Sequence, residues 1–150
     1  MKLAEALIER SDLQTRIDAM QQRLLNNARV QEGETPAEDP AALMRELDAM
    51  SARLEELIRR INLTNAETEI DGTTITALIA HRDCLTKKAG ILRNFLAAAS
   101  SLTQRASRTE IVIRSTVSVA DLQKQVDELS REIRVTDTKI QAANWTTELL

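Results

Sequence analysis

His81 and Cys84 are the residues of this sequence best suited to metal or nucleophilic chemistry, because a spacing of three places them on one helix face. Zinc takes such ligands, but a site needs four of them, or three and a water molecule. The sequence holds one histidine and one cysteine, so carboxylates would have to complete the site. A nucleophilic pair would also need donors for an oxyanion, and nothing Gly-rich surrounds it. We therefore interpret the pair as a surface histidine and a half-buried thiol, and expect no metal, no cofactor and no catalytic residue.

Four acidic residues gather in one loop-like segment, and carboxylates are ligands that calcium prefers. Their spacing lacks the alternating Asp/Asn pattern of an EF-hand loop. We interpret them as part of a solvated loop that also caps the following helix. The four are Glu32, Glu34, Glu38 and Asp39.

Polar residues that interrupt apolar helix seams are the third candidate for chemistry. Arg10, Asn27 and Arg82 occupy seam positions. Buried polar groups are costly unless paired, and in coiled coils a single one often fixes the register or the oligomeric state. We favour that structural role, and expect an acid or carbonyl on another helix to pair with Arg82. The alternative is a ligand-binding polar site between helices, formed by Asn26, Asn62, Asn65, Arg82 and Trp145.

The composition argues against several kinds of partner. Phe95 and Trp145 are the only aromatic residues, whereas ligand pockets and single-strand nucleic-acid binders rely on aromatic surfaces. The net charge is −3, and the basic residues alternate with acids rather than forming a tract. Since nucleic-acid binding needs clustered Lys and Arg, we expect no nucleic-acid partner.

Four segments carry apolar residues at alternating spacings of three and four, which is the heptad pattern of coiled-coil-like helices. We predict helices at about residues 2–28, 40–65, 74–104 and 119–143. The first seam contains Leu3, Ala6, Arg10, Leu13, Ile17, Met20, Leu24 and Asn27, and the second contains Leu43, Leu47, Met50, Leu54, Leu57 and Ile61. The third contains Ile75, Leu78, Arg82, Leu85, Ala89, Leu92, Leu96 and Ala99, and the fourth contains Val119, Leu122, Val126, Leu129, Ile133, Thr136, Ile140 and Ala143.

Turn and cap residues separate these helices. Asp39 followed by Pro40 predicts an N-cap and a first helical residue. Asp71-Gly72 predicts a turn before the third helix. Ser118, with Asp121 three residues later, predicts the start of the fourth helix.

The third predicted helix has a second apolar stripe beside its seam. Two adjoining stripes indicate a helix covered on more than one side. We expect it to be the best-buried helix, or the helix that faces a second subunit. The stripe contains Ile91, Phe95, Ala98 and Leu102.

Residues 109–117 have a different pattern, with β-branched residues at alternate positions, and predict a short extended segment. A single strand cannot satisfy its own backbone hydrogen bonds. The segment is therefore either a solvated linker or a strand that pairs with the same strand of another copy. The alternation of apolar residues favours the second reading.

Together these patterns predict an all-α protein with one domain over residues 1–150. We expect an elongated, antiparallel, coiled-coil-like four-helix bundle with one short extended β segment before the last helix. Long thin bundles leave much lateral surface, so we also expect a homo-oligomer, preferably with two-fold symmetry.

The expected location is the cytoplasm. The N-terminal residues turn at once into a charged amphipathic pattern rather than the uninterrupted apolar stretch of a signal peptide. No run approaches the ~20 apolar residues that cross a bilayer. The single cysteine, Cys84, cannot form an internal disulfide, which fits a reducing compartment.

Five segments of the sequence are distinctive: residues 24–34, 36–40, 61–65, Arg82-Asp83 and 141–145. They resemble a family of small bacterial proteins of unknown function, some of which carry the label septicolysin. The resemblance spans nearly the whole chain and implies no established activity, catalytic residue or cofactor. The label implies a cytolysin, for which only Thr109–Val119 could insert into a membrane, and Arg114 interrupts it.

We accordingly expect a non-enzymatic, self-associating helical protein that acts as a scaffold or adaptor. The alternative is a small-molecule-binding protein or enzyme with a polar site between helices. A septicolysin-type cytolysin is the third hypothesis.

Overall fold

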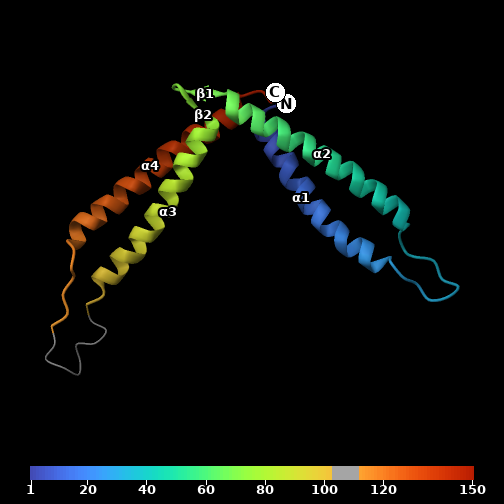
Figure 1. Cartoon of the computed structure of the whole chain (residues 1–150), viewed down its shortest axis with the longest axis horizontal. Coiled ribbons are helices and arrows are strands. Elements are labelled where there is room, and N and C mark those ends of the chain that lie inside the picture. The colour runs from blue at the N-terminus through green and yellow to red at the C-terminus, as the bar shows by residue number, and fades with distance from the viewer. Residues whose placement is uncertain (103–111) are drawn as a thin grey trace. The chain divides into compact units, whose positions relative to one another are not determined.

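The computed structural model describes residues 1–102 and 112–150, and these form four helices and one small antiparallel sheet (Figure 1). The prediction of a mainly helical protein is confirmed. The described residues form two compact units, residues 1–69 with 143–150 and residues 70–142. The packing of all four helices in one bundle domain therefore stays a prediction. The elements are α1 (Leu3–Asn26), α2 (Pro40–Glu67), β1 (Glu69–Ile70), β2 (Thr73–Thr74), α3 (Ile75–Ser100) and α4 (Val119–Thr146).

The predicted helix starts are confirmed by their caps. The Asp39 carboxylate accepts hydrogen bonds from the backbone N–H groups of Ala41 and Ala42, and Pro40 is the first helical residue. The Ser118 hydroxyl accepts from the N–H of Asp121, at 3.3 Å, just before α4 begins. These side chains satisfy donors that the first turn of a helix leaves without partners.

In the first unit, α1 and α2 are antiparallel. Arg53 of α2 pairs with Glu9 near the start of α1, whereas Arg23 near the end of α1 pairs with Glu46 near the start of α2. An early residue of α1 thus contacts a later residue of α2, and a late residue of α1 contacts an earlier one, so the two helices run in opposite directions. The core between them follows the two predicted seams, with fully or nearly fully buried side chains at Leu3, Ala6, Leu13, Met20, Leu43, Met50, Leu57 and Ile61.

The last residues of the chain are fixed to the same unit by backbone hydrogen bonds. The N–H of Leu3 donates to the carbonyl of Thr147, and the N–H of Leu149 donates to the carbonyl of Met1. Thr64, which is completely buried, accepts from the N–H of Leu150 at 3.0 Å and donates to the carbonyl of Arg60 at 2.8 Å. One hydroxyl thus joins the last turns of α2 to the end of the chain.

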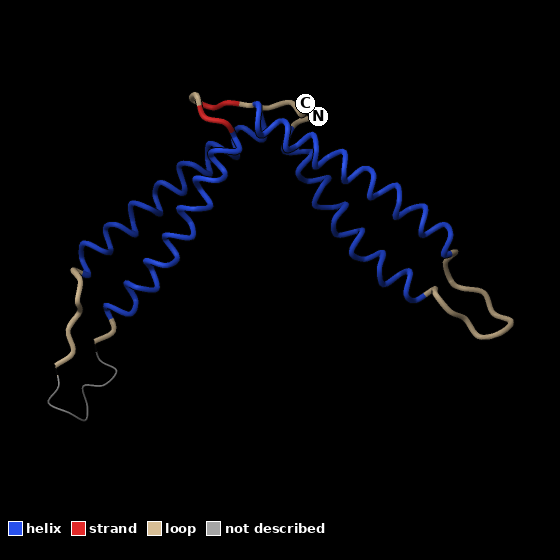
Figure 2. The backbone as a smooth tube through the Cα atoms, in the orientation of Figure 1, coloured by secondary structure: helices blue, strands red, loops and turns tan. Residues whose placement is uncertain are grey.

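A β-hairpin between α2 and α3 was not predicted from the sequence, where only its turn was recognised (Figure 2). Asp71 and Gly72 have φ angles of 52° and 78°, which both lie in the left-handed region. A two-residue turn of this kind matches the twist of paired strands, and Asp-Gly is among its preferred sequences. Lys139 of α4 pairs with Asp71 at 2.8 Å, and this holds the pKa of that carboxyl below its usual value.

In the second unit, α3 and α4 run antiparallel beside one another (Figure 1). His81 contacts Glu132, and Arg93, further along α3, donates to Ser130, nearer the start of α4. The predicted seams face inward, but α3 has only two buried residues, Ile75 and Ala89. The expectation that this helix is the best buried within the chain is therefore wrong. Its second stripe is exposed because α4 covers only the first.

The predicted extended segment lies partly outside the described residues, as do the last two residues of the predicted third helix. Residues 112–117 form no strand within the described chain. Val112 is 73% exposed, and the Ser115 hydroxyl donates to the carbonyl of Val117 in a local turn. Pairing of this segment between copies stays a prediction.

Candidate interaction surface

The α1–α2 pair is closed on one side and open on the other. On α1, the seam positions Ala6, Leu13 and Met20 are buried, whereas Ile17 and Leu24 are only partly buried. On α2 the same contrast separates two sets of seam residues that alternate along the helix. Leu43, Met50 and Leu57 are buried, and Leu47 and Leu54 are partly exposed.

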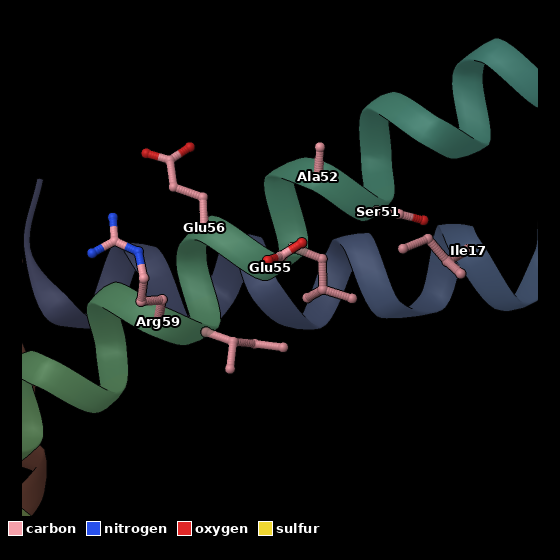
Figure 3. A pocket seen from close by; sticks show the side chains of 8 residues that line it. Ile17, Ser51, Ala52, Glu55, Glu56 and Arg59 are labelled. Carbon is pink, nitrogen blue, oxygen red and sulfur yellow. The ribbon is translucent and has the colours of Figure 1, made fainter.

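A groove of about 740 Å³ lies on the open side (Figure 3). One wall is Ile17 of α1, and the rest comes from α2. Ile58, which widens the α2 seam, is 38% exposed there. In a pair of helices, each heptad seam covers the other seam. The apolar residues that flank the seams are covered by neither helix, so this surface has no partner inside its unit. The lining residues are Ile17, Ser51, Ala52, Leu54, Glu55, Glu56, Ile58 and Arg59.

Both signs of charge border the groove. Glu56 is paired within α2, at 2.9 Å from Arg53 and 3.6 Å from Arg60. Glu55 and Arg59 also line the groove, but neither has an oppositely charged group within 4.0 Å among the described residues. A surface that carries an unpaired acid and an unpaired base is able to complement a copy of itself.

Arg10 is the one basic residue of the α1 seam. It follows Glu9, and the two hydrogen bonds between Glu9 and Arg53, of 2.7 and 2.9 Å, place Arg10 about level with Ala52 in the antiparallel pair. These bonds also hold the pKa of the Glu9 carboxyl below its usual value. Arg10 has no described ion pair, and its Nε is buried without a hydrogen-bond partner in the part of the chain that is described. Leaving such a donor unsatisfied costs about 1–3 kcal/mol.

The loop that joins α1 to α2 is fixed by side-chain contacts. Asn27, at the end of the α1 seam, is 7% exposed; its amide donates to the carbonyl of Arg23 and its oxygen accepts from the N–H of Glu38. Arg23 pairs with Glu38 at 2.6 Å, and this contact lowers the pKa of Glu38. Arg23 also pairs with Glu46. The polar seam residue Asn27 is thus a structural residue whose amide group is hydrogen-bonded at both ends. The loop residue Glu38 supplies one of these bonds through its backbone N–H.

The five residues of the predicted polar site do not form one cluster. Asn26, exposed at the end of α1, is bonded to Gln22. Asn62 and Asn65 are at the opposite end of the same antiparallel pair, roughly 35 Å away at 1.5 Å of helix rise per residue. Asn62 is exposed, Asn65 is partly buried, and Trp145 near the end of α4 is 59% exposed.

Arg82 belongs to the second unit and has two acidic partners. Its Nη1 donates to Asp137 of α4 at 2.9 Å, as the seam position predicted. Its Nε and Nη2 also donate to Asp83, the next residue of α3, at 3.0 and 2.9 Å. The long Arg side chain folds back to reach the adjacent carboxylate, and both acids raise the pKa of Arg82.

The other residues that could take part in metal binding or catalysis are spread over the surface. His81 and Cys84 are both exposed, so the thiol is less buried than expected, and the His81 ring contacts Glu132 at 2.9 Å. Over residues 1–102 and 112–150, no three His, Cys, Asp or Glu side chains come together as a metal site. None of the described helices combines the length and apolar character needed to cross a bilayer.

A second apolar surface is the uncovered stripe of α3. Ile91, Phe95 and Leu102 are 60%, 43% and 43% exposed. A shallow groove of about 510 Å³ lies beside Phe95, between α3 and the start of α4. This stripe was identified from the sequence, whereas the groove of the first unit was not, although Ile58 beside the second seam was a signal for it.

Comparisons with known proteins describe a family and one solved relative. The model of a family of unknown function (DUF6847) matches residues 10–149, and the chain therefore belongs to this family. A crystal structure of a functionally unknown conserved protein from Corynebacterium diphtheriae is 39% identical, with a TM-score of 0.89 over 100% of this chain and 99% of that one. A comparison with curated proteins gave no match. The resemblance to an uncharacterised family is confirmed, and the septicolysin label has no support from these matches.

Proposed function

We propose that this member of a family of unknown function is a non-enzymatic, self-associating helical protein that serves as a scaffold or adaptor. The observation that carries the proposal is the groove on the open side of the α1–α2 pair, where Ile17, Leu54 and Ile58 remain at least partly exposed. Apolar surface of this kind is a common mark of protein interaction sites.

A second copy is the occupant that the chemistry favours. The groove offers an apolar floor with an unpaired acid, Glu55, and unpaired bases, Arg10 and Arg59, near it. An isologous two-fold contact places the same patch on both subunits, so such a surface needs both signs of charge to be self-complementary. Two α1–α2 pairs packed in this way make a coiled-coil-like layer of four helices, with the two-fold symmetry that we propose for the oligomer.

The proposed location is the cytoplasm. The lone, exposed Cys84 has no intramolecular disulfide partner and suits a reducing compartment.

The proposal is tested by placing a charge in the groove. Ile58→Glu buries a carboxylate at the interface and removes an apolar contact that is worth about 1.5–3 kcal/mol when fully buried. We expect wild-type protein to be a dimer by sedimentation equilibrium at micromolar concentration, and Ile58→Glu to be a monomer with unchanged helix content. Ile8→Glu is the matched control, because Ile8 is 61% exposed and does not line the groove.

The uncovered stripe of α3 supplies the competing outcome. Phe95→Glu should leave the mass unchanged if the groove carries the association. A monomer with Phe95→Glu and a dimer with Ile58→Glu would assign the interface to α3 instead. A monomeric wild-type protein would refute self-association itself.

A further inference from the structure

We infer that Arg10 of one copy forms an ion pair with Glu55 of the partner subunit, and that this pair sets the register of the dimer. The inference rests on the proposed function, because it needs a second copy on the groove. It names the polar contact through which two otherwise apolar surfaces recognise one another.

The first support is that neither residue has an ion-pair partner among the described residues, unlike most arginines of the α1–α2 pair. Five other arginines of the α1–α2 pair have acids in the same unit, at 2.6–3.9 Å. Arg10 and Glu55 have none among the described residues, and the Nε of Arg10 is buried as well. The five paired arginines are Arg16, Arg23, Arg45, Arg53 and Arg60.

The second support is position. Arg10 is seven residues before Ile17, so both lie on the same row of α1, and Ile17 lines the groove. Glu55 lines the groove from α2. The Glu9–Arg53 ion pair makes residues 9 and 53 level, so Arg10 and Glu55 lie within about one helical turn of the same height.

With two-fold symmetry, these positions bring Arg10 of one copy close to Glu55 of the partner subunit. In an isologous interface, if one residue touches a second across the axis, the second touches the first in return. An axis that crosses the groove at the height of Leu54 therefore brings each Arg10 opposite a Glu55, and the pair occurs twice. Each contact gives the Arg10 guanidinium a carboxylate partner, and an arginine–carboxylate hydrogen bond is stronger than a neutral one.

The same pair also discriminates between registers. A shift of the two copies by one heptad keeps apolar rows in contact, because the rows repeat every seven residues. It separates Arg10 from Glu55 of the partner subunit by about 10 Å, at 1.5 Å of rise per residue, and so removes the ion pair.

Charge exchange between two chains tests the inference. Arg10→Glu alone and Glu55→Arg alone each place like charges across both contacts, and we expect each to weaken the dimer about tenfold or more. In an equimolar mixture of the two variants, a heterodimer has one exchanged pair and one wild-type pair, both attractive. We expect the mixture to dimerise as tightly as wild-type protein in sedimentation equilibrium. Arg131→Glu, an exposed position of α4, is the control for a change of net charge.

The outcomes separate the two proposals. If wild-type protein dimerises but the mixture is no tighter than the single variants, the pair is refuted and self-association stands. The same holds if Arg10→Glu/Glu55→Arg in one chain restores the dimer while the mixture does not, because the contact is then within a chain. A monomeric wild-type protein refutes the proposed function and the inference with it.

Discussion

Thr64→Val tests how firmly the end of the chain is attached to the first unit. Thr64 is fully buried, and its hydroxyl makes two hydrogen bonds, one to the carbonyl of Arg60 and one from the N–H of Leu150. Valine preserves the shape but removes both bonds. The Arg60 carbonyl accepts an ordinary bond of the helix besides, so the main loss is the acceptor for the partly buried Leu150 N–H.

Leaving a buried donor without an acceptor costs about 1–3 kcal/mol, and we expect a loss in that range for Thr64→Val. The assay is urea unfolding at one fixed protein concentration, because self-association makes stability depend on concentration. Thr15→Val is the matched control: Thr15 is exposed, and its hydroxyl makes only the local bond to the carbonyl of Ser11, at 3.1 Å. Equal losses of unfolding free energy for the two variants, or unchanged hydrogen exchange at the Leu150 N–H, would refute the role of the Thr64 hydroxyl in attaching the end of the chain.

Three further changes have expected outcomes. Asp39→Ala removes the cap of α2 and should cost about 0.5–2 kcal/mol in urea unfolding, whereas Asp48→Ala on the exposed face of α2 should cost less. Leu57→Ala, at a site with no exposed surface, should cost about 2–5 kcal/mol, and Leu63→Ala, 40% exposed, much less; similar losses would contradict the assigned core. Arg23 lowers the pKa of Glu38, so their contact stabilises the fold above the ordinary glutamate pKa and is lost as the pH falls through the lowered value. Glu38→Gln should therefore flatten the acid side of the stability–pH curve, and an unchanged curve would contradict that contribution.

The helices and their buried faces were predictable from the sequence because the heptad pattern is local. Each seam position of α1 and α2, including the polar Asn27, is buried or partly buried. Asp39 and Ser118 marked the helix starts correctly, since a cap involves only the next three residues.

The hairpin was missed because its strands are two residues long, too short for a period-two pattern. Its turn was the usable signal, as Asp71-Gly72 favours paired strands on either side. The burial of α3 was overestimated for a different reason. An apolar stripe such as Ile91 and Phe95 shows that a helix has a second surface to cover, but not whether the same chain covers it.

The candidate site was only partly predictable. Arg10 was recognised as a polar seam residue, and its position on the seam is confirmed by its partly buried state. Arg10 lacks a partner because the nearby acid Glu9 already pairs with Arg53. This contact joins residues more than forty positions apart, so the sequence pattern does not reveal it. Asn26 and Asn62 were assigned to one polar site between helices, whereas the antiparallel pairing of α1 with α2 separates them.

The mass of the wild-type protein in solution tests the central claim most directly. Sedimentation equilibrium over a range from nanomolar to micromolar concentration should give a species of twice the 16.8 kDa chain mass that dissociates reversibly on dilution. A single species of 16.8 kDa at every concentration would contradict the account.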